Sequence, residues 1–246
     1  MNVIENLDAN LKTLRMPFVR EHYQDTAKHA TAKGLGHIDY LHTLVCGEAD
    51  QREQRAIKRR IKAAAFPFLR TLDMYDFTHP QQVDRMHVTD LFTLRFIKDA
   101  ANVVFVGNTG LGKTHLAVSL AHHACLNGHK VLYTSASSMV NDLISAQAAH
   151  RLPDALKRYI RPAVLLVDEL GYLPIDKLGA DLLFQVISGR YERGSIILTT
   201  NLIFKNWTPI FSDDATLTSA ALDRLLHHHE LIIIKGKSYR GHKPVE

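Results

Sequence analysis

One eight-residue stretch constrains the fold more than any other feature of the chain. Residues 107–114 have the sequence Gly-Asn-Thr-Gly-Leu-Gly-Lys-Thr, which matches the phosphate-binding pattern G-x-x-x-x-G-K-[ST]. In such a loop, successive backbone N–H groups converge on phosphate oxygens, and the helix that follows adds the positive end of its dipole. The pattern predicts that Lys113 reaches the terminal phosphates and that the Thr114 hydroxyl binds Mg²⁺.

The flanking sequence agrees with this interpretation. Residues 102–106 are mostly apolar and β-branched, as in a buried parallel strand, and apolar residues recur at helical spacing from His115 to Asn127. From residue 101 onward, strand and helix patterns alternate, which predicts an α/β domain with a parallel sheet and helices on both faces. We expect strands at 102–106, 130–134, 163–168, 195–200 and 230–235.

Composition bounds the class of protein. The 246 residues carry a net charge of +5, a moderate indication of a polyanionic partner such as nucleic acid. Cys46 and Cys125 lie far apart, which argues against a zinc ribbon or a disulfide framework, and we expect both to be buried thiols in a reducing compartment. No run approaches the roughly 20 apolar residues of a membrane span, and no signal peptide is evident, so we expect a cytoplasmic protein without a membrane partner.

Residues 1–66 have a purely helical pattern. A first stripe contains Leu11, Pro17 begins a second helix, and a third helical region places Ile38, Leu41 and Val45 on one face. We therefore predict a helical N-terminal domain over 1–66, for oligomerisation or for DNA or partner contacts. An ATPase domain follows over 67–246. Its connector, 67–100, contains Pro and aromatic residues and a short predicted helix at 90–98.

Polar residues follow two of the predicted strands, where ligands bind in parallel sheets. Asp168 and Glu169 end the strand at 163–168, a pattern in which the Asp holds Mg²⁺ and the Glu orients the attacking water. Asn201 follows the strand at 195–200 and is predicted to lie beside the γ-phosphate. An Asp-Glu pair favours a hydrolysing enzyme over a kinase that phosphorylates a small molecule.

Several arginines could stabilise charge on the γ-phosphate in the transition state. Arg224 lies on a predicted helix and Arg240 near the C-terminus, and either could act in its own subunit or in a neighbour. Arg190 and Arg193 are rival candidates for action in a neighbouring subunit, and the sequence alone does not choose among them.

Two basic segments and one histidine run have less specific interpretations. The segments are either solvated helix faces or DNA-phosphate contacts, and the candidate residues are Lys58, Arg59, Arg60, Arg151, Lys157, Arg158 and Arg161. His227, His228 and His229 suggest a metal site, but neighbouring histidines on a helix or strand do not share a face. No nearby carboxylate or cysteine cluster completes a site in the sequence, so we predict that they bind no metal.

With these motifs placed, the chain resembles the IstB-like transposition helper ATPases of insertion sequences, and more distantly the DnaC-like helicase loaders. The resemblance covers about residue 5 to residue 242. It rests on 112–117, 168–174, 190–195, 223–228 and 235–240, with smaller matches at 52–55 and 66–67. The P-loop differs from the common family pattern only at Asn108-Thr109, which replaces Pro-Pro.

The resemblance implies an AAA+ P-loop core with a five-stranded sheet in the order 5-1-4-3-2 and a short lid. It implies ATP and Mg²⁺ as cofactors and slow, regulatory hydrolysis between subunits of a homo-oligomer, with Arg224 acting in trans and Arg240 in cis. It further implies assembly on duplex DNA with little sequence preference, deformation of that DNA, and recruitment or activation of a partner transposase. The alternative that it leaves open is a replicative helicase loader.

Overall fold

The computed structural model describes residues 2–79, 82–172 and 175–239. The chain divides into two compact units, Met1–Arg59 and Arg60–Glu246, and the change falls inside one long helix. Each unit is described separately below. Among the described residues, no helix is both long enough and apolar enough to cross a membrane.

The first unit is helical, as predicted. It contains α1 (Val3–Thr13), α2 (Pro17–Lys33) and the greater part of α3 (His37–Ala64). Pro17 occupies the first position of α2, where its missing N–H costs nothing, and Gly34 ends the helix in the left-handed conformation.

The apolar core of this unit is small. Its buried residues are Leu11, Val19, Tyr23 and Leu44. The face predicted for the third helix differs, because Ile38, Leu41 and Val45 are exposed and Leu44 packs inward instead. Glu48 is also buried, because its carboxylate accepts hydrogen bonds from the backbone N–H groups at the start of α2, which the helix itself leaves unpaired.

The second unit is built on a five-stranded parallel sheet with the order β2-β3-β4-β1-β5. Read from the other edge, this is the predicted order 5-1-4-3-2. The five strands lie within about two residues of the predicted ranges: β1 (Asn102–Gly107), β2 (Val131–Ser135), β3 (Val164–Leu170), β4 (Ser195–Thr200) and β5 (His229–Ile234).

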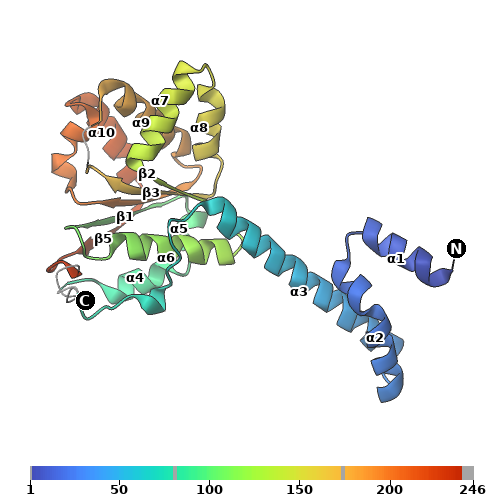
Figure 1. Ribbon diagram of the computed structural model, residues 1–246. Helices are drawn as coiled ribbons and strands as arrows, with labels where there is room; N and C mark the ends of the chain where they lie inside the picture. The colour runs from blue at the N-terminus through green and yellow to red at the C-terminus, as the bar shows by residue number, and fades with distance from the viewer. Residues whose placement is uncertain (1, 80–81, 173–174, 240–246) are drawn as a thin grey trace, which may run out of the picture. The chain divides into compact units, whose positions relative to one another are not determined.

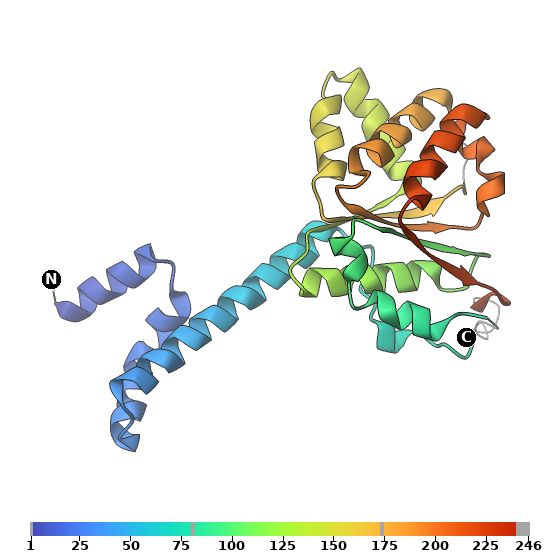
Figure 2. The ribbon, with the colours of Figure 1, turned by 180° about the vertical axis from the view of Figure 1, so that it is seen from behind.

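Helices cover both faces of the sheet (Figures 1 and 2). One face packs against α4 (Arg85–Leu91), α5 (Arg95–Lys98) and α6 (Lys113–Leu126). The other packs against α7 (Ala136–Ala148), α8 (Leu152–Ile160), α9 (Lys177–Arg190) and α10 (Ala215–Leu226). Three short 3₁₀ helices, η1 (Leu72–Met74), η2 (Phe204–Asn206) and η3 (Thr208–Phe211), lie in the connections.

Alternating strand residues supply the two cores. Val103 and Phe105 of β1 face the α6 side, whereas Val104 and Val106 face the α9 side. This period of two is the ordinary consequence of a pleated strand that is buried on both faces.

Two local predictions were wrong. The single helix predicted at 90–98 is two helices, because Leu94 adopts a left-handed conformation with φ 60° and breaks the helix between them. Cys125 is buried as expected, and burial raises its pKa to about 11, but Cys46 is exposed on α3.

Candidate nucleotide-binding site

The predicted phosphate loop connects β1 to α6, and its glycines have the conformations that the pattern requires. Gly110 and Gly112 have φ of +82° and +83°, values that favour glycine. A Cβ on Gly112 would lie 2.6 Å from Cε2 of Tyr75, so close packing also excludes a larger residue. Lys113 opens α6, is buried, and donates from Nζ to the Asn108 carbonyl at 2.9 Å. Its ammonium therefore already lies over the loop that would hold phosphate.

Thr114 and Asp168 meet as the sequence predicts. The Thr114 hydroxyl donates to Asp168 Oδ1 at 2.9 Å, and the hydroxyls of Tyr133 and Thr199 donate to the same carboxylate. Three hydroxyl donors compensate for the burial of the Asp168 charge, and burial together with that charge raises the pKa of Tyr133. Hydroxyl and carboxylate oxygens beside a phosphate loop are ligands that suit Mg²⁺.

Glu169 lies at an irregularity in β3, next to Asp168. The register between β3 and β4 shifts between Val167 and Leu170, and Glu169 has φ 61°. Its backbone N–H donates to the Thr199 hydroxyl at 2.9 Å, while its side chain is exposed. The two adjacent carboxylates thus lie in different surroundings: Asp168 is buried, and Glu169 lines the cavity at the phosphate loop.

A cavity of about 300 Å³ lies over the phosphate loop, a size that suits a small ligand. Besides residues 109–115 and Glu169, its walls contain mainly aromatic and apolar side chains that we did not predict as site residues: Phe68, Met74, Tyr75, His79, Tyr172 and Tyr239. The first four come from the connector at 67–100, whose aromatic composition was the available signal.

Tyr75 is the best-anchored residue of this wall. Its hydroxyl donates to the Leu111 carbonyl at 3.2 Å, and its ring packs edge-on against His115. Burial, helped by the Asp76 charge, raises the pKa of Tyr75 to about 12. Burial also lowers the pKa of His115, whose ring lies 3.1 Å from the Thr71 carbonyl.

The segment after β5 returns to the phosphate loop. The backbone N–H of Tyr239 donates to the Gly110 carbonyl at 2.9 Å, and the Tyr239 ring packs edge-on against His79. Lys235 forms an antiparallel bridge with Gln82. Arg240, the predicted cis-acting arginine, lies outside the described residues.

Asn201 follows β4 at the predicted end of the sheet but does not line the cavity. Its Oδ1 is buried and has no hydrogen-bond partner among the residues that the structure describes. A buried amide oxygen without a partner costs free energy. The role of Asn201 beside the γ-phosphate stays a prediction.

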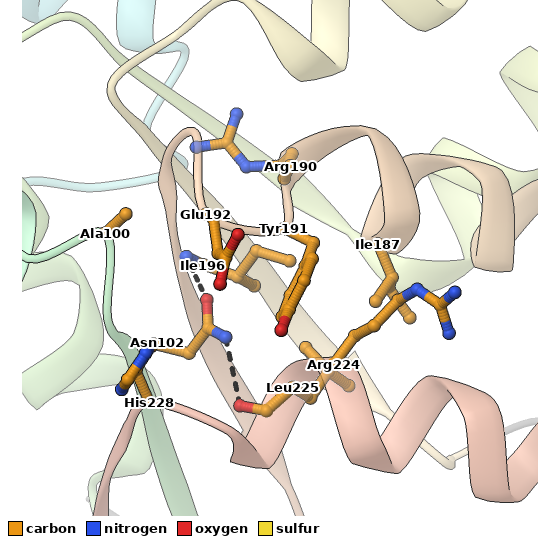
Figure 3. A pocket seen from close by; sticks show the side chains of 10 residues that line it. All are labelled: Ala100, Asn102, Ile187, Arg190, Tyr191, Glu192, Ile196, Arg224, Leu225 and His228. Atoms are coloured by element: carbon orange, nitrogen blue, oxygen red, sulfur yellow. Dashed lines mark hydrogen bonds between the residues drawn. The ribbon is translucent and has the colours of Figure 1, made fainter.

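The remaining arginine candidates, Arg190, Arg193 and Arg224, lie at the opposite end of the sheet, and Figure 3 shows Arg190 and Arg224. Arg224 lines a small pocket with Asn102 and Ile196, which are the first or second residues of β1 and β4. Its guanidinium lies 5.0 Å from the Phe184 ring centroid and is partly exposed. Because the strands are parallel, Arg224 is remote from the phosphate loop of its own chain.

Arg190 is not available to act on the γ-phosphate of a neighbouring subunit. It is buried, and its two terminal nitrogens donate to the carbonyls of Tyr159, Ile160, Pro162, Ala163 and Ser195. Burial lowers its pKa to about 10. Arg190 therefore joins the end of α8 to the starts of β3 and β4, and it is no rival to Arg224. Arg193 is exposed.

The candidate DNA contacts differ in their surroundings. Most are exposed: Lys58, Arg59, Arg151, Lys157, Arg158 and Arg161. Lys157 pairs with Asp154 and Arg158 with Asp142, whereas Arg60 is half-buried and donates from Nε to the Cys125 carbonyl at 2.9 Å. Arg60 therefore has a structural contact with the end of α6.

The sheet order, the phosphate loop after β1 and the Asp-Glu pair on β3 together define a P-loop nucleotide-binding protein of the AAA+ class. Residues 9–246 match the family model described as IstB-like ATP binding protein. The chain belongs to this family and is an ATP-binding protein.

Related sequences match this chain over nearly its whole length. A protein named for ATP binding in insertion sequence IS5376 of Geobacillus stearothermophilus is 38% identical over 227 residues, which is 92% of this chain and 90% of the relative. One named in the same way for insertion sequence IS21 of Pseudomonas aeruginosa is 37% identical over 237 residues, covering 96% of this chain and 89% of the relative.

Solved structures share the fold. A DnaC helicase loader matches 72% of this chain and 99% of its own, with a TM-score of 0.54 and 24% identity. A DnaA replication initiator bound to AMPPCP and single-stranded DNA matches 68% of this chain and 50% of its own, with a TM-score of 0.56 and 19% identity.

Proposed function

We propose that this protein is an ATP-hydrolysing AAA+ regulator of insertion-sequence transposition. In this proposal it assembles on duplex DNA with little sequence preference, deforms that DNA, and recruits or activates a partner transposase. The observation that carries the proposal is the phosphate loop with its buried Asp168 and cavity-facing Glu169, in a chain whose relatives are named for ATP binding in insertion sequences. Such work on genomic DNA would take place in the cytoplasm.

Hydrolysis is proposed from the separate roles of the residues around the loop. The backbone of 107–112 and Lys113 bind the phosphates, and the Thr114 and Asp168 oxygens are suited to hold Mg²⁺, which supplies charge neutralisation when bound. Glu169, exposed to the same cavity, orients and polarises the attacking water. Asn201, which follows β4 at the same end of the sheet, is proposed to assist it. We infer slow turnover, with ATP acting as an assembly switch.

Self-association is proposed from the position of Arg224. Its side chain is partly exposed and lies at the end of the sheet opposite the phosphate loop. Arg224 could therefore reach a γ-phosphate only in another copy of the chain. Arg240 keeps its predicted cis role. The helical region 1–66 is proposed for oligomerisation, DNA or partner contacts, and the exposed apolar residues Ile38, Leu41 and Val45 are consistent with a protein contact.

DNA binding is proposed from charge. The chain has a net charge of +5, and exposed basic residues gather at the end of α8, including Arg158 and Arg161. Bending a short duplex substantially costs roughly 1–6 kcal/mol. Phosphate contacts repeated over several subunits can offset that cost, and each contact would add to the salt dependence of binding.

The test is ATP-dependent binding to duplex and to single-stranded DNA at several salt concentrations. We expect tight duplex binding only with ATP or a non-hydrolysable analogue, and weaker binding by Arg161→Glu. Lys205→Glu is the charge-matched control, because Lys205 is exposed but lies in η2 beyond the other end of the sheet. Equal duplex binding with and without ATP would overturn the assembly switch.

The second candidate is a replicative helicase loader, favoured by the fold shared with a DnaC helicase loader. In that case the same experiment should give ATP-dependent binding to single strands and little to duplex. A pull-down with the partner transposase that the first proposal requires then separates the two functions, because only the transposition proposal needs that complex.

A further inference from the structure

A second group of chemically active side chains lies at the end of the sheet that is remote from the nucleotide cavity. Glu192 lies in the turn between α9 and β4, and His227 and His228 lie in the turn between α10 and β5. Each of the three can offer one ligand atom, and these atoms all lie within 4.8 Å of one another. All three side chains are exposed, and Figure 3 shows Glu192 and His228 in the pocket that also contains Arg224.

The structure removes both reasons for which the sequence argued against a metal here. His227 and His228 lie between the end of α10 at Leu226 and the start of β5 at His229, so neither helical nor strand periodicity separates them. Their ring centroids are 4.1 Å apart with an interplanar angle of 41°. The missing carboxylate comes from Glu192, 35 residues earlier in the chain than His227, and brought close by the pairing of β4, β1 and β5.

The surroundings of His227 hold its ring in place. The Tyr191 hydroxyl lies 2.8 Å from His227 Nδ1, and a Glu192 oxygen lies 3.9 Å from the same nitrogen. These two contacts fix the orientation of the His227 ring. Two imidazoles and one carboxylate, with no fourth protein ligand among the described residues, match the donor set of open zinc sites.

We propose that Glu192, His227 and His228 form a binding site for a divalent transition-metal ion such as Zn²⁺, with at least one coordination position open to solvent. Ligand atoms around Zn²⁺ are about 3.3 Å apart, from bond lengths of about 2.0–2.1 Å. The three exposed side chains therefore need shifts of about 1 Å to close on the ion. Imidazole ligands select transition metals over Mg²⁺ and Ca²⁺, so the site is chemically distinct from the magnesium site proposed at Thr114 and Asp168.

A bound ion would join two turns that no covalent link connects. One turn follows α9 and the other follows α10, which carries Arg224. Because Arg224 lines the same pocket as Glu192 and His228, the ion would fix the frame around the arginine proposed to act on a neighbouring subunit.

The experiment is a titration of the full chain with Co²⁺, without nucleotide, followed by visible absorption and by competition with Zn²⁺. We expect one tight equivalent in the wild type, and affinity reduced about tenfold or more in Glu192→Gln, His227→Asn and His228→Asn. His29→Asn is the matched control, because His29 is exposed on α2, and it should keep wild-type affinity.

A conservative variant separates ligation from folding. His228→Cys should retain Co²⁺ binding and add a thiolate-to-cobalt charge-transfer band above the background from Cys46, as measured in the wild type. Equal Co²⁺ affinity in the wild type and the three ligand variants would overturn the proposal. So would a His228→Cys protein that binds Co²⁺ without the new band.

Discussion

The two ends of the sheet in the second unit use the same kinds of side chain in opposite ways. At the carboxyl end, Lys113 and Asp168 are buried and bonded within the chain, around a cavity that is open to a ligand. At the amino end, Arg190 is buried and its two terminal nitrogens donate to five carbonyls, whereas Arg224 is partly exposed and lines a small pocket.

The carboxyl end is built to bind a nucleotide within one chain, whereas the amino end carries an arginine that could act on a neighbouring molecule. Phosphate binding needs groups held in advance, and the backbone and Lys113 supply them within one chain. An arginine that lies far from the nucleotide of its own chain can contribute to hydrolysis only after subunits assemble. We infer that the carboxyl end binds ATP in each subunit and that Arg224 contributes to hydrolysis in another.

The largest effect is expected at Arg190. Arg190→Met leaves five buried or partly buried carbonyls without this donor, and we expect a loss of about 3–5 kcal/mol in the free energy of unfolding. Arg193→Met, three residues away and exposed, should change it by less than about 0.5 kcal/mol. Urea denaturation measures both, and equal stabilities would show that Arg190 is not a structural residue.

Glu169→Gln tests the carboxyl end. The amide keeps the size of the side chain but cannot polarise water, so ATP turnover should fall about 100-fold while ATP affinity changes less than about threefold. Steady-state phosphate release and equilibrium binding of ATP give the two numbers. A variant that hydrolyses ATP at the wild-type rate would remove Glu169 from the mechanism.

Tyr75 tests whether the connector belongs to the nucleotide site. Tyr75→Ala removes the ring packed against Gly112 and the hydrogen bond to Leu111, and ATP affinity should fall about tenfold, or about 1.4 kcal/mol. Tyr75→Phe keeps the ring and should lose less. If both variants bind ATP as the wild type does, the connector only covers the cavity.

The smallest effect concerns pH. Burial lowers the pKa of His115 below its ordinary value of 6.5, so in mildly acidic solution the unfolded chain binds more protons than the folded one. Stability should therefore fall as the pH drops from 7 through 6.5. The pKa of His122 is lowered by burial too, so His115→Gln should flatten the profile of melting temperature and His115→Gln/His122→Gln should flatten it further.

The sequence predicted the sheet well because its signals are local. Five apolar strand segments and a glycine loop define their own conformation, and the order of the strands followed from the family resemblance. The pairing of Thr114 with Asp168 was predictable for the same reason, since both motifs end at the same edge of a parallel sheet.

Other features depend on contacts between distant segments and could not be read from local pattern. Tyr75 lies over Gly112 only because the connector folds back on the phosphate loop. Arg190 had the same appearance in sequence as Arg224, and only burial distinguishes them. Glu192 meets His227 through the order of the strands, which no spacing rule for metal ligands encodes.

The central claim is that Arg224 acts on the nucleotide of another subunit, and mixed subunits test it most directly. Arg224→Ala and Lys113→Ala should each be inactive alone. Mixed equally, they should regain about a quarter of the wild-type ATPase rate, since an intact Lys113 then meets an intact Arg224 at about one interface in four. A mixture of Glu169→Gln with Lys113→Ala, both altered at the same end, should stay inactive. A mixture of Arg224→Ala and Lys113→Ala with no activity above the sum of its parts would contradict the account.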